Sequence, residues 1–90
     1  MKIKITIQKC YLTSNTQVVK TYEMQENQAE IELELGFFLT KTQVNNEINL
    51  QLTKNNKLLG VAKPFLNTPD KIFVDFFDMA LTFIFEVVNA

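Results

Sequence analysis

Hydrophobic and polar side chains alternate through most of the first sixty residues of the chain. The alternation is strict over residues 2–8, 30–35 and 47–53, where isoleucine or leucine occupies every second position. A repeat of two is the period of a β-strand with one buried face. Residues 17–24 and 58–62 alternate less cleanly but are rich in side chains that favour strands. These five runs therefore predict short β-strands.

Short polar segments rich in asparagine separate the runs. They are residues 13–16, 25–28, 45–46, 54–57 and 67–70. These segments predict turns and loops, with a hairpin connection at residues 54–57, where asparagine tolerates the left-handed backbone conformations that tight turns need. Gly36 interrupts the run that begins at residue 30 and predicts a bulge or bend before Phe37.

Residues 71–88 fit two secondary structures. As strands, residues 71–77 and 81–88 are β-branched and aromatic runs joined near residues 78–80. As a helix, Thr68 would be the N-cap, Pro69 would be the first helical residue, and polar side chains would recur every three or four positions. Phenylalanine, valine and isoleucine lose rotamer freedom in a helix, so strands are favoured.

The whole chain, residues 1–90, is predicted to be one all-β domain, because 90 residues support a single hydrophobic core. Strands at this spacing predict an antiparallel β-sandwich of seven or eight short strands. The alternative is a five- or six-stranded meander or barrel with one C-terminal helix.

Composition removes most catalytic and metal-binding chemistry. The chain has no histidine, arginine or tryptophan, and its single cysteine, Cys10, cannot form an intrachain disulfide. Histidine supplies most general bases near neutral pH and many metal ligands. We therefore expect no enzyme activity, no metal and no cofactor. The acidic group of Asp70, Asp75 and Asp78 is interpreted as solvent-facing. A lone thiol and a charged, alternating start favour a cytoplasmic location.

The strongest indication of function is the apolar C-terminal segment. Ile84 and Val88 would lie on one face of the last strand, and phenylalanine and valine on the other. A strand that is apolar on both faces must be covered on both sides. It is either a central core strand or part of an interface with a protein partner or a second copy. The candidate interface anchors are Phe73, Phe76, Phe83 and Phe85.

A second hypothesis is a β-barrel that binds single-stranded nucleic acid. Lys2, Lys4 and Lys20 would form a basic face, with Tyr11 or Tyr22 available for base stacking. The net charge of −1 does not favour this hypothesis. The glutamates of residues 30–34 are also placed to pair with these lysines across strands.

Three segments of the chain resemble C2 domains. Residues 47–66, with an alternating strand, a short polar loop and a Leu-Leu-Gly entry to the next strand, are similar to the later strands of that family. Residues 80–88 resemble its terminal strand, and residues 2–12 resemble its first. The resemblance implies a β-sandwich that docks proteins or, as a weaker alternative, an anionic membrane surface.

Two loops depart from the calcium-binding members of the C2 family. Those members carry aspartates where this chain has Thr13-Ser-Asn-Thr16 and Lys54-Asn-Asn-Lys57. Calcium needs several carboxylate oxygens converging on one point, so the departure implies a calcium-independent module. In that setting Lys54 and Lys57 are the expected contacts for an anionic ligand or lipid.

Overall fold

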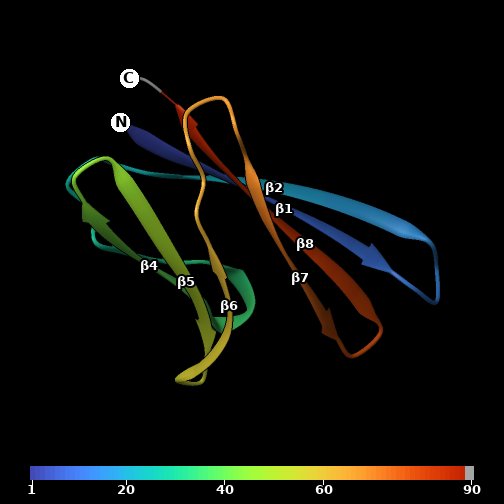
Figure 1. Ribbon diagram of the computed structural model, residues 1–90. Coiled ribbons are helices and arrows are strands. Elements are labelled where there is room, and N and C mark those ends of the chain that lie inside the picture. The colour runs from blue at the N-terminus through green and yellow to red at the C-terminus, as the bar shows by residue number, and fades with distance from the viewer. Residues whose placement is uncertain (89–90) are drawn as a thin grey trace.

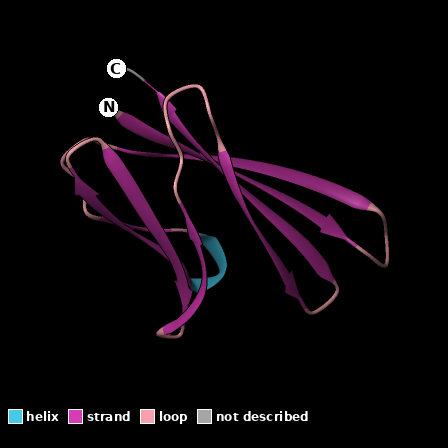
Figure 2. Cartoon of the chain, viewed as in Figure 1, coloured by secondary structure: helices cyan, strands magenta, loops and turns pink. Residues whose placement is uncertain are grey.

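The computed structural model describes residues 1–88, which form two four-stranded antiparallel sheets packed face to face (Figure 1). Strands make up almost all of the regular structure, and one short 3₁₀ turn is the exception (Figure 2). The elements are β1 (Lys2–Tyr11), β2 (Thr16–Met24), β3 (Glu30–Glu32), the 3₁₀ turn η1 (Glu34–Gly36), β4 (Phe37–Val44), β5 (Glu47–Lys54), β6 (Lys57–Ala62), β7 (Asp70–Phe76) and β8 (Met79–Val88). The predicted antiparallel sandwich of seven or eight strands is confirmed, with eight strands and with β7 and β8 in place of the alternative C-terminal helix.

One sheet is a meander of consecutive strands, and the other joins two hairpins through β1 and β8. One sheet has the order β2-β1-β8-β7, and the other has the order β3-β4-β5-β6. Each strand pairs with its neighbour in sequence except at two crossings between the sheets, β2 to β3 and β6 to β7. The pairing of β1 with β8 brings the two ends of the chain together. The sandwich thus has edge strands at β2, β7, β3 and β6.

The period-two pattern sets which side chains face the core. Ile3, Ile5 and Ile7 of β1 are buried and face the second sheet. In β8 the odd-numbered residues from Met79 to Val87 are buried, while the even-numbered ones are half-exposed on the outer face. The prediction that Ile3, Ile5 and Ile7 share the buried face is confirmed, because alternate strand residues point to opposite faces of a sheet.

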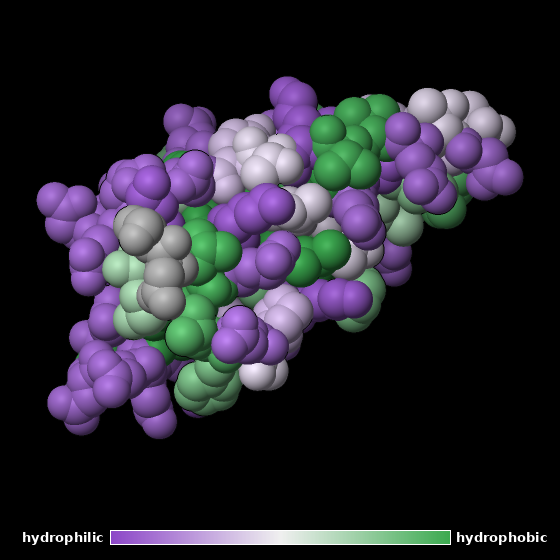
Figure 3. All heavy atoms as spheres, turned by 90° about the horizontal axis from the view of Figure 1, so that it is seen from above, coloured by the Kyte–Doolittle hydropathy of each residue, from purple (hydrophilic) through white to green (hydrophobic). Residues whose placement is uncertain are grey.

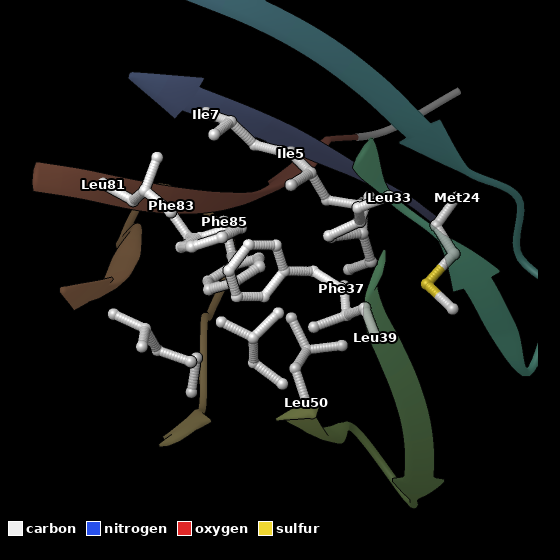
Figure 4. Close-up of a cluster of buried hydrophobic side chains, with 14 of the residues drawn as sticks. Ile5, Ile7, Met24, Leu33, Phe37, Leu39, Leu50, Leu81, Phe83 and Phe85 are labelled. Atoms are coloured by element: carbon white, nitrogen blue, oxygen red, sulfur yellow. The ribbon is translucent and has the colours of Figure 1, made fainter. Parts of the chain in front are cut away.

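The core joins both sheets through aromatic contacts. Phe37 of β4 meets Phe83 of β8 edge-on, with ring centroids 5.2 Å apart and an interplanar angle of 64°. Figure 4 shows Phe37 reaching from one sheet toward Phe83 and Phe85 on the other, with Leu39 and Leu50 beside it. Aromatic rings prefer this edge-to-face arrangement.

The sheets approach each other most closely where β6 passes β7. A Cβ atom added to Gly60 of β6 would lie 2.8 Å from Cγ2 of Ile72 on β7. No ordinary carbon contact is that short, so only glycine allows this approach. The apolar run 58–62 therefore needs its glycine for packing between the sheets.

The asparagine-rich segments form the expected turns. Asn55 and Asn56 join β5 to β6 with φ values of 52° and 62°, as a two-residue type I′ hairpin turn requires. Asn15, Asn45 and Asn67 also have positive φ in their turns. Asparagine adopts this region at lower cost than bulky residues do.

One predicted strand is shorter than its pattern indicated. Alternation predicted a strand over residues 30–35 with Leu35 inward, but β3 ends at Glu32, and Leu35 is exposed in η1. Leu35 and Gly36 both have positive φ, 60° and 79°, so the chain bends here. The bend turns Glu34 toward two lysines of the other sheet, and this tertiary contact interrupts the alternation.

Candidate interaction surface

Two of the four predicted interface anchors lie inside the core. Phe83 and Phe85 are fully buried on β8, and their rings stack with centroids 6.5 Å apart. Their prediction as surface anchors is wrong, because β8 is a central strand and its phenylalanine face is covered by the second sheet. The alternative interpretation, a central core strand, is correct for the face of β8 that carries Phe83 and Phe85.

The other two anchors lie on the edge strand β7, one on each face. Phe73 points outward and is 72% exposed, whereas Phe76 points inward and is half-buried. The Phe76 ring meets the rings of Phe37 and Phe77 at 6.0 Å and 4.7 Å. Phe73 is thus available to a partner, while Phe76 packs against the rings of Phe37 and Phe77.

The most exposed large apolar residue of residues 1–88 is one that the sequence reasoning did not select. Phe77 is 91% exposed in the turn between β7 and β8. The turn had been expected at residues 78–80, which kept Phe77 within a strand. Because Ile72 and Phe76 face inward and Phe76 pairs with Met79, the turn consists of Phe77 and Asp78. Continuing the inward–outward alternation of β7 as far as Phe76 would have identified Phe77 as an exposed turn residue.

The Phe77 backbone is in an unfavourable conformation for its residue type. Its φ is 55°, in the left-handed region where a bulky side chain is an outlier. The hairpin turns after β1, β4 and β5 place asparagine at such positions. A strained and exposed aromatic residue is a reason to look for a function.

A second exposed apolar side chain lies beside this turn. Leu12, in the β1–β2 turn, donates its backbone N–H to the carbonyl oxygen of Asp78 at 2.7 Å. The Thr13 hydroxyl donates to Asp78 Oδ2 at 3.3 Å. These bonds hold the two turns together at one end of the sandwich. We call Leu12, Phe77 and Asp78 the tip.

Lys54 and Lys57 are register partners across the β5–β6 hairpin, but their ammonium groups have different surroundings. The Lys54 ammonium lies 5.0 Å and 4.9 Å from the ring centroids of Phe37 and Phe76, and donates to the Leu35 carbonyl. Cation–π contacts and this hydrogen bond therefore hold the Lys54 ammonium beside the two rings, an arrangement that does not favour its predicted role as an anion contact. Only Lys57 of the two is exposed.

Lys2, Lys4 and Lys20 do not share one face. Lys2 and Lys4 lie on the outer face of β1, and Lys2 Nζ is 3.3 Å from Glu23 Oε1. Lys20 pairs in register with Ile7, so it points to the opposite face. Ile7, the register partner of Lys20, lies an odd number of residues from Lys2 and Lys4 along β1. The three lysines therefore do not form the predicted basic face for nucleic acid, and the sheets do not close into a barrel.

Lys20 instead joins an ion triad between the sheets. Glu34 Oε1 lies 2.9 Å from Lys9 Nζ, and Glu34 Oε2 lies 3.2 Å from Lys20 Nζ. The Lys9 and Glu34 side chains are only 10% and 13% exposed. Burial raises the Glu34 pKa, but the two ammonium groups lower it more, so the net shift is downward. The hydrogen bond to Glu34 raises the Lys9 pKa.

An apolar hollow of about 370 Å³ lies at the end of the sandwich opposite the tip, beside the start of β1 and the end of β8. Figure 3 shows hydrophobic side chains reaching the surface at this end. Phe65 and Leu66, in the connection between β6 and β7, are about half-exposed there. The hollow is lined by Met1, Asn46, Ile48, Pro64, Phe65, Leu66 and Val87.

Other chemistry is sparse in the described part of the chain. Cys10 is a free, half-buried thiol, in agreement with the expectation of an unpaired cysteine. Among residues 1–88, no three acidic or cysteine side chains gather as metal ligands would. The same residues include no helix with the length and apolar character needed to cross a bilayer. No protein-family model, curated protein or solved structure matches this chain.

Proposed function

We propose that this chain is a non-enzymatic protein–protein interaction module, acting as a small subunit or adaptor in a larger assembly or as a homo-oligomer. The observation that carries the proposal is Phe77, held 91% exposed in a left-handed turn. Aromatic side chains, phenylalanine among them, are enriched at protein interfaces relative to the rest of the surface. The absence of histidine and arginine from the sequence supports the non-enzymatic part.

A second exposed phenylalanine supports the same proposal. Phe73 lies on the outer face of β7, on the same hairpin as Phe77. Its register neighbours across the sheet are Thr82, Gln8 and Val19. This row is uncharged, so a partner can cover it without desolvating a charge.

The proposal predicts a stoichiometric protein complex that depends on these two rings. Tagged wild-type chain, expressed in its native source, should recover a partner or further copies of itself. The double variant Phe73→Asn/Phe77→Asn should lose at least about nine-tenths of that recovery. Leu58→Asn, which removes an exposed apolar side chain from the opposite sheet, is the matched control. A wild-type chain that sediments as a monomer and recovers nothing in stoichiometric amount would contradict the proposal.

The C2 resemblance adds calcium independence to the proposal. The β1–β2 turn contributes no carboxylate of its own, and the carboxylate bonded to it is that of Asp78. One carboxylate is too few for a specific calcium site. We expect the melting temperature in excess calcium to match that in chelator, with magnesium as the control for ionic strength. A rise with calcium alone would show that the interpretation of these loops is wrong.

A further inference from the structure

We propose that copies of this chain join head to tail, with Phe77 of one copy seated in the apolar hollow at the far end of the next. The inference rests on the proposed function, since it names a second copy as the partner. It assigns one role to two features that the fold does not explain, the strained tip and the open hollow.

The tip has the properties of a projecting anchor. The Phe77 ring is exposed, and its contact with the Phe76 ring at 4.7 Å limits how it can turn. Phe76 in turn packs against Phe37 of the core. A ring whose position is fixed before binding loses less conformational entropy on association.

The turn would fold more favourably without this ring. Asparagine occupies the corresponding positive-φ position in the hairpins after β1, β4 and β5, so the chain already uses a less strained solution elsewhere. Phe77 therefore exposes apolar surface and strains the backbone with little return to the isolated chain. A contact between Phe77 and another molecule accounts for both the exposed ring and the strained backbone.

The hollow fits such an anchor in size and polarity. Its volume of about 370 Å³ exceeds the roughly 150 Å³ at which an apolar cavity already accepts benzene. Phe65, Leu66 and Val87 line it, and Asn46 contributes an amide. An aromatic ring entering it would lose contact with water and gain contact with aliphatic and aromatic carbon atoms.

The positions of the two features decide the type of assembly. The tip and the hollow lie at opposite ends of the ten-residue strand β8 (Figure 1), which spans about 33 Å. A chain therefore cannot fill its own hollow. A contact between two different surface sites is heterologous and, when its rotation does not close a ring, it extends into an open chain.

Sedimentation of the purified chain tests this contact. From roughly 10 µM to roughly 1 mM, the range expected for a small interface, wild-type mass should rise continuously with concentration. Phe77→Asn should abolish the rise while leaving the melting temperature equal or higher, because asparagine relieves the turn. Leu66→Asp, at an exposed rim position, should abolish it as well, and Leu58→Asn should leave it unchanged.

Mixing the two defective variants gives the sharper result. Phe77→Asn retains the hollow, and Leu66→Asp retains the ring, so an equimolar mixture should form a one-to-one dimer and nothing larger. A mixture that stays monomeric, or a wild type that stops at a dimer, would overturn the head-to-tail contact. A monomeric wild type that still recovers a different protein through Phe73 and Phe77 would overturn this inference alone. Failure of that recovery too would overturn the proposed function.

Discussion

Replacing Phe83 with alanine is expected to lower the free energy of unfolding by about 4 kcal/mol. The ring is fully buried and packs edge-on against Phe37 of the other sheet. Removing it loses the transfer free energy of the ring and leaves a cavity between the sheets. Small domains have only about 5–15 kcal/mol of stability in total, so the variant should lose a large part of its stability. Urea unfolding followed by circular dichroism measures the difference.

Phe73→Ala is the matched control for this experiment. The same substitution on the exposed face of β7 should change the free energy of unfolding by about 0.5 kcal/mol or less. Equal losses at the two positions would contradict the assignment of Phe83 to the core and Phe73 to the surface. The pair therefore separates a packing role from an interface role in one assay.

Glu34→Gln is expected to lower the free energy of unfolding by about 3 kcal/mol. The substitution retains the shape of the side chain but removes the negative charge that faces Lys9 at 2.9 Å and Lys20 at 3.2 Å. Lys9 is buried and would be left as an uncompensated ammonium group. Lys20 is 55% exposed and stays hydrated, so it adds less. Chemical unfolding at pH 7 and constant ionic strength measures the loss.

Two further variants show whether burial causes this loss. Glu23→Gln makes the same change in the exposed pair with Lys2, and it should cost less than about 1 kcal/mol. Adding Lys9→Met to Glu34→Gln should recover much of the lost stability, because no charge is then buried without a partner. A double variant as unstable as the sum of its single variants would argue against coupling between the two side chains.

The same comparison has a defined pH dependence. The Glu34 pKa in the folded chain lies below its usual value of 4.5, so its contribution is complete above pH 4.5 and is lost as the pH falls through the lowered pKa. The Lys9 pKa lies above its usual 10.5, so its contribution is complete below pH 10.5 and is lost as the pH rises through the raised pKa. The stability difference between wild type and Glu34→Gln should therefore be largest between these limits.

Local pattern predicted most of this fold because each strand has a core face and an outer face. A repeat of two reports that asymmetry directly, as at Ile3, Ile5 and Ile7. Asparagine marked the hairpins because its preference for positive φ is a property of the residue itself. Each of these signals needs only a few neighbouring residues.

The sequence predictions that were wrong concern features that local pattern does not determine. The pattern at residues 30–35 indicated a continuous strand, but the chain bends where Glu34 meets lysines from another sheet. Apolar character selected Phe83 and Phe85 as interface anchors, yet their exposure depended on which sheet covers β8. The exposure of Phe77 was not predicted because the turn was expected to begin at residue 78. The turn begins one residue earlier, which places Phe77 in the tip rather than in the strand.

The sequence by itself determined an all-β chain, the inward-facing isoleucines of β1 and the absence of histidine chemistry. Only the tertiary structure decided strand order, the separation of Lys20 from Lys2 and Lys4, the ion triad, and the placement of the tip and the hollow at opposite ends. Alternation and turn preference act between near neighbours, whereas these features depend on contacts between residues far apart in the chain. Which phenylalanines are free to meet a partner follows from how the two sheets cover each other.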